Sequence, residues 1–472
     1  MINARQLSAP PCATDTETLL NEIVQTVPPG RSALPAAARA RLTRITADLL
    51  AVRPDSVAEA TRYLRVRGRR FPLPDAPVAA ALAGRTVLVT GGSGCVGTAL
   101  LADLVRLRPG RLINVDLVAP PRRTPGVEHL RLDLRERRAV DDCFARHRPD
   151  VVFHLAAQRD PGLAERLVAD TLGTNLAGTV NVITAAERSG ADRLIFASTG
   201  KAVRMHSTDV YAGSKRLCEW LVGAAAARGR LACSAVRFTH VVDNAIILER
   251  LRRWCAERGV IRLHSAATLF YVQSAAEAAQ LLLAAATDPE PDGPRVTVLR
   301  DLDWPVHLLD LALGVMALAG TVTPIYLAGH DPGYAAQAYP GLYDPATAGD
   351  VSPLINAVEA GALVTSPYPE LDAFRLDPVP APQVAALLPD LLAHGLRGDD
   401  VAARQVFEQV TWLLLAATAR ATPQQAVRRM VRLAEGHRPT MTGSHRRVDD
   451  VLRASLAPTD DAGATRAAQA PA

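Results

Sequence analysis

The chain has few lysines, few aromatic residues and no long apolar run. Lys201 and Lys215 are its only lysines, although lysine and arginine together number 53 among 472 residues. Aromatic residues make up 4% of the chain, and no stretch approaches the roughly 18–20 uninterrupted apolar residues of a membrane span. The first twenty residues also lack the apolar core of a secretion signal. We therefore expect a soluble, cytoplasmic protein that does not bind a membrane.

Paired cysteines and a concentrated basic patch are missing as well. None of the six cysteines belongs to a CxxC pair or has the spacing of metal ligands, so we expect reduced thiols and no metal site. The net charge is +5, but the arginines are interleaved with Asp and Glu along the chain. The densest basic run, residues 63–71, is short and is typical of a solvated helix end. We expect a small-molecule substrate and no nucleic-acid partner.

Short apolar runs alternate with amphipathic stretches from residue 84 onward. The runs predict strands at residues 86–90, 111–116, 129–133, 151–157, 193–198, 233–238, 259–263, 269–272 and 295–299. Apolar strands separated by helices indicate βαβ units and a parallel sheet that is buried on both faces. The predicted fold is therefore α/β: a Rossmann-type doubly wound parallel sheet with a smaller substrate-side lobe and helical additions at both ends.

The chain is expected to divide into five parts. The first is a helical N-terminal region at residues 1–80, with helices near 15–27, 34–52 and 55–67. A core at 84–345 then combines the Rossmann sheet with the substrate lobe. A loop-rich connection at 346–382, a helical C-terminal region at 383–456 and a disordered tail at 457–472 follow. The terminal helices either pack on the core or build a subunit interface, because the broad apolar face of residues 403–421 needs burial. We expect a homo-oligomer.

A glycine-rich turn joins the first expected strand to a helix. The segment TGGSGCVG provides Gly91, Gly94 and Gly97. In a dinucleotide-binding turn such glycines make the tight bend, let the backbone approach a pyrophosphate and let helix and strand pack closely. The diphosphate would accept hydrogen bonds from the first N–H groups of the helix, near Cys95 and Val96. Because the turn follows an apolar strand and opens a helix, it predicts dinucleotide binding.

Acidic residues at the ends of the next two strands bear on which dinucleotide binds. Asp116 ends the second strand, where a carboxylate can accept hydrogen bonds from ribose hydroxyls and repel a 2′-phosphate, so it favours NAD over NADP. Arg122 and Arg123 follow Asp116 closely in the sequence, and their positive charges leave NADP as an alternative cofactor. Asp133, followed by Leu134, ends the third strand and either binds the adenine amino group or caps the next helix.

The residues Tyr211 and Lys215 form the pattern Y-x-x-x-K. On a helix these positions share a face, so the ammonium lies beside the phenol and is expected to stabilise the phenolate. Tyr211 could then exchange a proton with a substrate alcohol while the nicotinamide carries the hydride. Thr199, at the end of the fifth expected strand, could hydrogen-bond the same oxygen.

The other lysine, Lys201, follows Thr199 by two residues and should project into the same cleft. A desolvated lysine near other cations can act as a base. Lys201 is therefore a candidate for removing a proton next to a newly formed ketone. The alternative, a loop lysine without a chemical role, remains open.

These motifs resemble the extended short-chain dehydrogenase/reductase superfamily, and within it the polysaccharide-biosynthesis branch of nucleotide-sugar 4,6-dehydratases and epimerases. The matching residues are TGGSGCVG at 90–97, His154 with Ala156 and Ala157, Thr174 with Asn175, STGKAV at 198–203, and the segment from Tyr211 to Arg216. The resemblance covers residues 85–345, approximately. It implies that Ala156, Ala157 and Asn175 contact NAD.

The resemblance also marks substrate-side positions at which this chain departs from the family. Gly200 stands where the family has the Asp that protonates a departing hydroxyl, Arg159 replaces a Lys, His240 replaces an Asn, and Leu269 replaces an Arg. Residues 331–335 read DPGYA, where the family has R-P-G-E-K and uses it to hold a nucleotide diphosphate. A diphosphate needs cations or aligned N–H groups, so these changes predict an intact redox centre with an altered substrate pocket.

The sequence thus predicts an NAD(P)-dependent enzyme that oxidises or reduces a secondary alcohol or ketone of a sugar-like or specialised-metabolite substrate, with epimerisation or elimination at the adjacent carbon. One alternative keeps the family activity on a nucleotide sugar, either 4,6-dehydration or epimerisation. Another is a cofactor-bound scaffold without catalysis. The Tyr211 and Lys215 pair argues against the scaffold, which has no need of it.

Overall fold

A nine-stranded sheet forms the centre of the molecule. The computed structural model describes residues 13–120, 123–244, 246–287, 293–330, 338–344, 346, 349–376, 379–441 and 443–456. The parallel part of the sheet consists, in spatial order, of β3 (Glu128–Arg131), β2 (Arg111–Asp116), β1 (Thr86–Thr90), β4 (Val151–His154), β5 (Arg193–Thr199), β6 (Ala232–Phe238) and β11 (Arg295–Leu299). β15 (Leu371–Arg375) and β14 (Leu363–Val364) extend it in antiparallel orientation. The predicted Rossmann-type fold is confirmed.

The strands form where the sequence has apolar runs. β1 and β2 have the predicted bounds, and the central residues of both are buried. The predicted strand at 151–157 is shorter, since β4 ends at His154 opposite the last residue of β1, Thr90. On the other side β5 continues beyond its pairing with His154 to Thr199, so the chain after His154 leaves the sheet before β5 ends.

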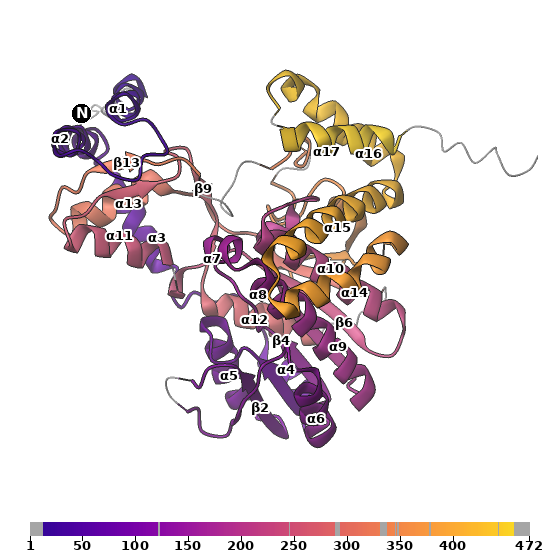
Figure 1. Cartoon of the computed structure of the whole chain (residues 1–472). Coiled ribbons are helices and arrows are strands. Elements are labelled where there is room, and N and C mark those ends of the chain that lie inside the picture. The colour runs from indigo at the N-terminus through magenta and orange to yellow at the C-terminus, as the bar shows by residue number, and fades with distance from the viewer. Residues whose placement is uncertain are drawn as a thin grey trace, which may run out of the picture.

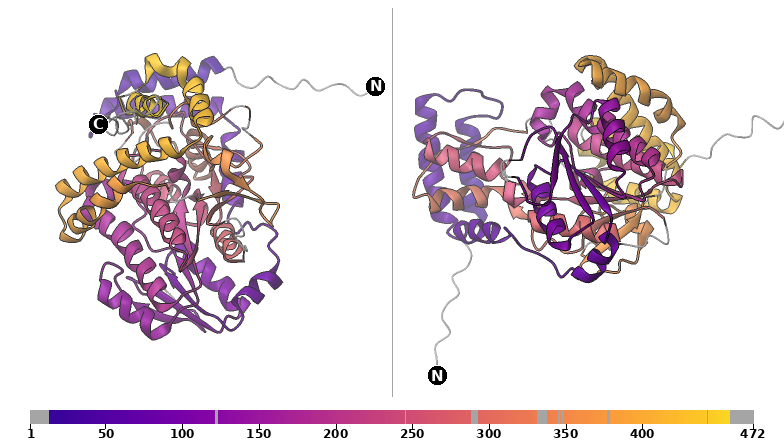
Figure 2. Two further views of the ribbon diagram at one scale, coloured as in Figure 1. Left: turned by 90° about the vertical axis from the view of Figure 1, so that its right-hand side faces the viewer. Right: turned by 90° about the horizontal axis from the view of Figure 1, so that it is seen from below.

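Helices cover both faces of this sheet (Figure 2). One layer contains α4 (Asp75–Leu82), α5 (Cys95–Leu107) and α12 (Ala275–Thr287), which pack on one another. The other contains α6 (Arg137–His147), α9 (Gly178–Ser189) and α10 (Val210–Ala227). The strand order reverses between β1 and β4, and in such sheets a crevice opens outside the carboxyl ends of the strands at this point.

The N-terminal helices belong to the substrate lobe. α1 (Ala13–Thr26), α2 (Ala36–Val52) and α3 (Ser56–Arg65) share one apolar core with α11 (Ile246–Ala256), α13 (Leu308–Leu318) and the parallel pair β8 (Ile261–Leu263) and β13 (Ile325–Leu327). Figure 1 shows these elements together on one side of the molecule. The guanidinium of Arg53 binds Asp310 through two hydrogen bonds of 2.5 and 2.6 Å. The lobe is therefore built from two distant parts of the chain.

Short ladders and turns connect the lobe to the sheet. They are β7 (His240–Val241) with β10 (Val272–Gln273), β9 (Leu269–Phe270) with β12 (Val306–His307), and the turn η3 (Val242–Asn244). The chain after β4 forms α7 (Pro161–Arg166), α8 (Val168–Leu172) and the π-helical turn η1 (Gly173–Ala177). The chain after β5 forms the 3₁₀ turn η2 (Gly200–Val203).

The C-terminal region covers one side of the Rossmann domain. α14 (Pro382–Arg397) and α15 (Asp400–Ala421) pack against α8, and α15 also packs against α10 (Figure 1). α16 (Gln424–Ala434), the 3₁₀ segment η5 (Glu435–Thr440) and α17 (Gly443–Ala454) follow, and α16 and α17 share a third core with α15. The connection expected to be loop-rich contains β14, β15 and the turn η4 (Glu359–Ala362). The predicted tail at 457–472 lies outside the described residues.

Two features are absent from the part of the chain that the structure describes. None of its helices is both long and apolar enough to cross a membrane. No group of three or more His, Cys, Asp or Glu side chains in these residues is placed to hold a metal ion.

Candidate active site

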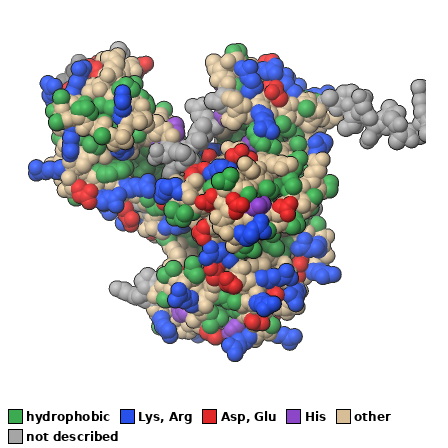
Figure 3. All heavy atoms as spheres, viewed as in Figure 1, with side chains coloured by type: hydrophobic (Ala, Val, Ile, Leu, Met, Phe, Trp, Pro, Cys, Tyr) green, Lys and Arg blue, Asp and Glu red, His purple; other side chains and the backbone are tan. Residues whose placement is uncertain are grey.

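A cavity of about 1780 Å³ opens at the carboxyl ends of the parallel strands and continues to the substrate lobe. Figure 3 shows the surface hollowed between the lobe and the body of the molecule. The predicted site residues that line the cavity are Gly91, Gly94, Cys95, Val96, Gly97, Asp116, Asp133, Leu134, Ala156, Ala157, Arg159, Thr199, Gly200, Lys201, Tyr211, Lys215, His240 and Leu269. Asn175 is not among the lining residues.

The glycine turn leaves no room for side chains. Gly91 has φ of +75°, and a Cβ on it would lie 2.6 Å from the backbone nitrogen of Ala156. A Cβ on Gly97 would collide with the carbonyl oxygen of Gly91. Gly94 is the N-cap of α5, so the free N–H groups of this helix begin at the cavity wall. The turn therefore fits the diphosphate of a dinucleotide, which would be held by these N–H groups.

The two acidic residues at the strand ends have different surroundings. The carboxylate of Asp116 accepts hydrogen bonds from the backbone N–H groups of Ser93 (2.9 Å) and Val118 (3.1 Å). The Arg135 guanidinium pairs with Asp133 at 2.6 Å and holds the pKa of that carboxyl below its usual range. The helix-cap alternative for Asp133 was wrong, because the N-cap of α6 is Glu136. Arg122 lies outside the described residues.

Asn175 and His154 support the cavity wall from behind. The Asn175 carboxamide accepts from the backbone N–H of Gln158 (2.8 Å) and donates to the Ser214 hydroxyl (3.0 Å). It therefore ties the chain after β4 to α10, although the family resemblance implied a contact with NAD. The ring of His154 lies between the hydroxyls of Thr90 and Thr179, and burial lowers its pKa to about 3.

Tyr211, Lys215 and Thr199 meet at the cavity. The Thr199 side chain lies near the Tyr211 hydroxyl and acts to lower its pKa. Lys215, one helical turn further along α10, is only 3% exposed, and its ammonium lies 4.2 Å from the centre of the Phe196 ring. Burial lowers the pKa of Lys215 to about 8. Burial also raises the pKa of Tyr211, and the opposing effects of Thr199 and Arg159 are smaller. The expected lowering of the phenol pKa is thus not produced by the protein's own groups.

The second lysine lies beside this centre. Lys201 belongs to η2, and its backbone N–H donates to the Thr199 hydroxyl at 3.4 Å. Burial lowers the pKa of Lys201 to about 8, and the charge of Arg204 acts in the same direction. Asp209, Glu165 and Asp160 oppose this shift. Both lysines of the chain therefore lie in the wall of one cavity with ammonium groups that lose protons more easily than usual.

The substrate side shows why two family residues are replaced. A Cβ on Gly200 would lie 2.8 Å from Cδ2 of Leu354, so this leucine occupies the space of a side chain at position 200. The ring of His240 lies 5.1 Å from that of Phe270, and its buried Nε2 has no hydrogen-bond partner. Burial lowers the pKa of His240 to about 4, so it presents a neutral imidazole. Leu269 is 55% exposed at the rim.

Cations that sequence reasoning missed line the lobe end of the cavity. Arg250 and Trp254 lie one turn apart on α11, and Arg262 is on β8. Arg262 donates to the carbonyl oxygen of Ser32 at 2.7 Å. The spacing of Arg250 and Trp254 places both on one helix face, which could have been read from the sequence. Residues 331–335, where the family's diphosphate motif was sought, lie outside the described residues.

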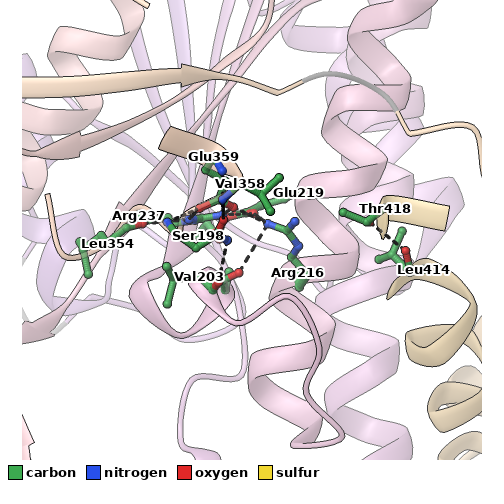
Figure 4. Close-up of polar contacts among 12 residues, drawn as sticks. Ser198, Val203, Arg216, Glu219, Arg237, Leu354, Val358, Glu359, Leu414 and Thr418 are labelled. Carbon is green, nitrogen blue, oxygen red and sulfur yellow. Dashed lines mark hydrogen bonds and ion pairs between the residues drawn. The ribbon is translucent and has the colours of Figure 1, made fainter. Parts of the chain in front are cut away.

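A buried ionic network lies under the catalytic strand end (Figure 4). Arg237 on β6 is fully buried and pairs with Glu219 of α10 (2.8 Å) and Glu359 of η4 (2.7 Å). The Ser198 hydroxyl donates to Glu219 at 2.6 Å, and Arg216 also pairs with both glutamates. Burial acts to raise the pKa of Glu219, but Arg237 and Arg216 hold it below its usual value. The network fixes β5, β6, α10 and η4 relative to one another.

Comparison with known proteins agrees with this geometry. The chain is 26% identical over 266 residues to the probable polysaccharide biosynthesis protein EpsC of Bacillus subtilis, covering 53% of this chain and 44% of that protein. It is 24% identical over 253 residues to the capsular polysaccharide biosynthesis protein CapD of Staphylococcus aureus, covering 51% and 41%. It thus spans less than half the length of these curated relatives.

Among solved structures, that of Pen from Bacillus thuringiensis has a similar fold. The TM-score is 0.53 at 20% identity, over 63% of this chain and 90% of that one. The model of the family described as NAD dependent epimerase/dehydratase matches residues 87–245, which hold the glycine turn, Thr199, Tyr211 and Lys215. Residues 87–245 therefore resemble the NAD-dependent epimerase/dehydratase family.

Proposed function

We propose that this protein is an NAD-dependent enzyme that oxidises a secondary alcohol of a sugar-like substrate to a ketone and can epimerise the adjacent carbon. The observation that carries the proposal is that Tyr211, Thr199 and the buried Lys215 line one cavity together with the glycine turn. The glycine turn, the α5 N-terminus and Asp116 would hold NAD. NAD would supply the hydride acceptor and a positive charge facing the phenol.

The side chains of the cavity have separate roles in this proposal. Tyr211 takes the proton of the substrate hydroxyl as the C–H hydride leaves, and Lys215 favours the resulting phenolate. Thr199 orients the same oxygen. Lys201, whose pKa is about 8, is partly neutral near pH 7 to 8 and can remove a proton next to the ketone. Return of that proton to the other face, followed by hydride return, gives the epimer.

Elimination of a hydroxyl is less well supported than epimerisation. It requires an acid for the leaving group, and the family's acid position is Gly200, whose side-chain space is filled by Leu354. Epimerisation needs no such acid. This contact therefore favours oxidation and epimerisation over 4,6-dehydration.

A nucleotide sugar is the second candidate for the substrate class. Arg250, Arg262 and Trp254 line the lobe end of the cavity and offer two cations and an aromatic face, which suit a nucleoside diphosphate. Relatives of this chain are named as polysaccharide biosynthesis proteins and as a dTDP-glucose 4,6-dehydratase. If the substrate is a nucleotide sugar, its nucleoside diphosphate is held by arginines of α11 and β8 instead of by the family's motif.

The test uses Tyr211→Phe against the unmodified protein. Both are incubated with NAD and a panel of free sugars and nucleoside diphosphate sugars, and NADH absorbance and deuterium uptake from solvent are followed. The variant is expected to bind NAD normally while turnover falls about 10²- to 10⁴-fold. Full turnover in the variant would remove Tyr211 from its role, and failure of the protein to bind NAD would overturn the proposal. NAD binding without any turnover would favour the scaffold.

Location and assembly also remain proposals. We propose a cytoplasmic protein, which is supported by described cysteines that form no disulfide, namely Cys95, Cys143, Cys218, Cys233 and Cys255. We also propose a homo-oligomer, supported by exposed Leu167, Leu396 and Val401 where the turn between α14 and α15 meets α8. Sedimentation velocity of the purified chain tests the second point, and a monomer at all concentrations would refute it.

A further inference from the structure

The loop that carries Lys201 is anchored in the C-terminal helices. This loop runs from η2 to the start of α10 at residues 200–209. Its Met205 is buried in the third core, together with Leu415, Met430 and Val431 of α15 and α16. The family match ends at residue 245, so the part of the chain that encloses this loop lies outside it.

An aromatic stack fixes the next residue of the loop. The ring of His206 lies 3.6 Å from the ring of Trp412, nearly parallel to it, and its Nε2 is 3.4 Å from the Thr411 hydroxyl. The guanidinium of Arg447 on α17 lies 4.1 Å from the same tryptophan ring. Burial lowers the pKa of His206 to about 4, so the stack does not change charge at neutral pH.

The helix α15 also touches α10 between its two functional residues. A Cβ on Gly213 would lie 2.6 Å from the ring of Phe407, so this buried ring rests directly on the α10 backbone between Tyr211 and Lys215. Arg404 of α15 binds Glu165 at 2.6 Å, and Glu165 in turn accepts the backbone N–H of Val210 at 2.7 Å. The first residue of α10 is thus held through Glu165 by α15.

We propose that α15 sets the relative positions of Lys201 and Tyr211, with Trp412, Phe407 and Arg404 as positioning residues. The C-terminal helices are then a functional part of the site and not only a cover for the Rossmann domain. The inference rests on the proposed function, which assigns Lys201 and Tyr211 their roles as proton-transferring groups. Its physical content is that α15 keeps Lys201 desolvated at the cavity wall, close to Thr199 and Tyr211.

The composition of the chain provides a direct measurement. Because the chain has only two lysines, protein labelled with ¹³Cε-lysine gives two side-chain NMR signals, which Lys201→Met and Lys215→Met assign. The titration of each signal reports the surroundings of that ammonium and requires neither substrate nor NAD. A failure of this inference is therefore distinguishable from a failure of the proposed function, which the turnover of Tyr211→Phe decides.

Trp412→Ala should release the loop and expose Lys201 to solvent. Its titration midpoint is expected to rise from about 8 toward its ordinary value of 10.5, by at least one pH unit, while the Lys215 signal stays in place. Trp412→Phe keeps a stacking ring and should restore the original midpoint. The control is Gln409→Ala, at an exposed position on α15, which should leave both signals unchanged.

Two variants that change the charge near Lys201 provide the test if Trp412→Ala fails to fold. Arg404→Gln leaves the Glu165 carboxylate unpaired and should raise the Lys201 midpoint, whereas Glu165→Gln removes a charge that favours the ammonium and should lower it. With a substrate in hand, Phe407→Ala should lower kcat at least tenfold with little change in KM. A Lys201 midpoint that stays the same in Trp412→Ala, Arg404→Gln and Glu165→Gln would overturn the proposal.

Discussion

The side chain of Leu354 occupies the place where a side chain on Gly200 would begin, with its Cδ2 2.8 Å from the Cβ position. Leu354 is buried in the main core, and its carbonyl oxygen accepts a hydrogen bond from Arg237 at 2.9 Å. The backbone of Leu354 is therefore held by the buried ionic network, and its side chain would have to turn away to admit a Cβ at position 200. The loss of the family's acid at position 200 and the position of this leucine are two parts of one packing arrangement.

The first prediction concerns Gly200→Asp. The new side chain should clash with Leu354 and lower the free energy of unfolding by about 1–3 kcal/mol, as overpacking does in other cores. Adding Leu354→Ala should make the aspartate better tolerated, so the two changes should not be additive. Urea unfolding of the two single variants and the double variant measures the coupling.

Gly436→Asp is the matched control for this cycle, because a Cβ at Gly436 has no heavy atom within 4 Å. It should change stability by no more than about 0.5 kcal/mol. Additive effects of Gly200→Asp and Leu354→Ala would show that the two positions do not compete for space.

The second prediction concerns the stability contribution of Lys215. Its folded pKa of about 8 lies below the usual 10.5, so the folded protein binds its proton less tightly than the unfolded chain does. This lowers stability below pH 8, and the loss disappears as the pH rises from 8 through 10.5. Lys215→Met should therefore raise the free energy of unfolding at pH 7 by up to about 3 kcal/mol while abolishing turnover.

Urea unfolding at pH 7 and at pH 10 tests this difference between Lys215→Met and the unmodified protein. The free energy of unfolding gained by Lys215→Met should be smaller at pH 10 than at pH 7. A variant that is less stable than the unmodified protein at pH 7 would show that the ammonium is better compensated than its burial suggests.

The third prediction concerns the ionic network. Arg237→Met leaves Glu219 and Glu359 buried without their main partner and should cost about 3–5 kcal/mol. Adding Glu219→Gln and Glu359→Gln should recover part of this loss, because the uncompensated charge is removed. The lowered pKa of Glu219 means that its contribution is present above the usual pKa of 4.5 and is lost as the pH falls through the folded value.

Chemical unfolding of the single and triple variants between pH 4 and 7 provides the measurement. Arg111→Met, which breaks a half-exposed pair with Glu128, is the control and should cost at most about 1 kcal/mol. An Arg237→Met variant as stable as this control would contradict the role assigned to the network.

The fourth prediction concerns the choice of cofactor. The Asp116 carboxylate, held by the N–H groups of Ser93 and Val118, should accept hydrogen bonds from the adenosine ribose. Asp116→Ser should weaken NAD binding about 10- to 100-fold, the usual cost of a hydrogen bond to a charged group. It should also narrow the preference for NAD over NADP. Calorimetric titration of both proteins with NAD and NADP measures these affinities. If Asp116→Ser binds NAD as tightly as the unmodified protein does, Asp116 does not contact the ribose.

The parts of the fold that the sequence predicted well are those with local signals. β1 and β2 follow from apolar runs, and the turn at Gly91 follows from glycine spacing. β15 was missed because it contains Asp372 and Arg375 and gains its place through antiparallel pairing with the distant β11. A five-residue strand with two charges carries little signal of its own.

The site was predicted less completely than the fold. Tyr211, Lys215 and Thr199 share one short segment, and their proximity could be read from spacing. The raised pKa of Tyr211 comes from burial, which depends on how distant elements enclose the ring. Arg237 could have been noticed as a charge within an apolar strand, but its partners Glu219 and Glu359 could not be identified before the chain was folded.

The lobe core has a consequence for how the protein acquires its structure. Residues 23–66 form one part of that core and residues 242–327 the other, and the parallel strands β1 to β6 lie between them in the chain. On a ribosome, the early helices emerge long before the segment that completes their core. Contacts of such large sequence separation form slowly, so we expect the Rossmann domain to be the first to fold and the substrate end of the cavity the last.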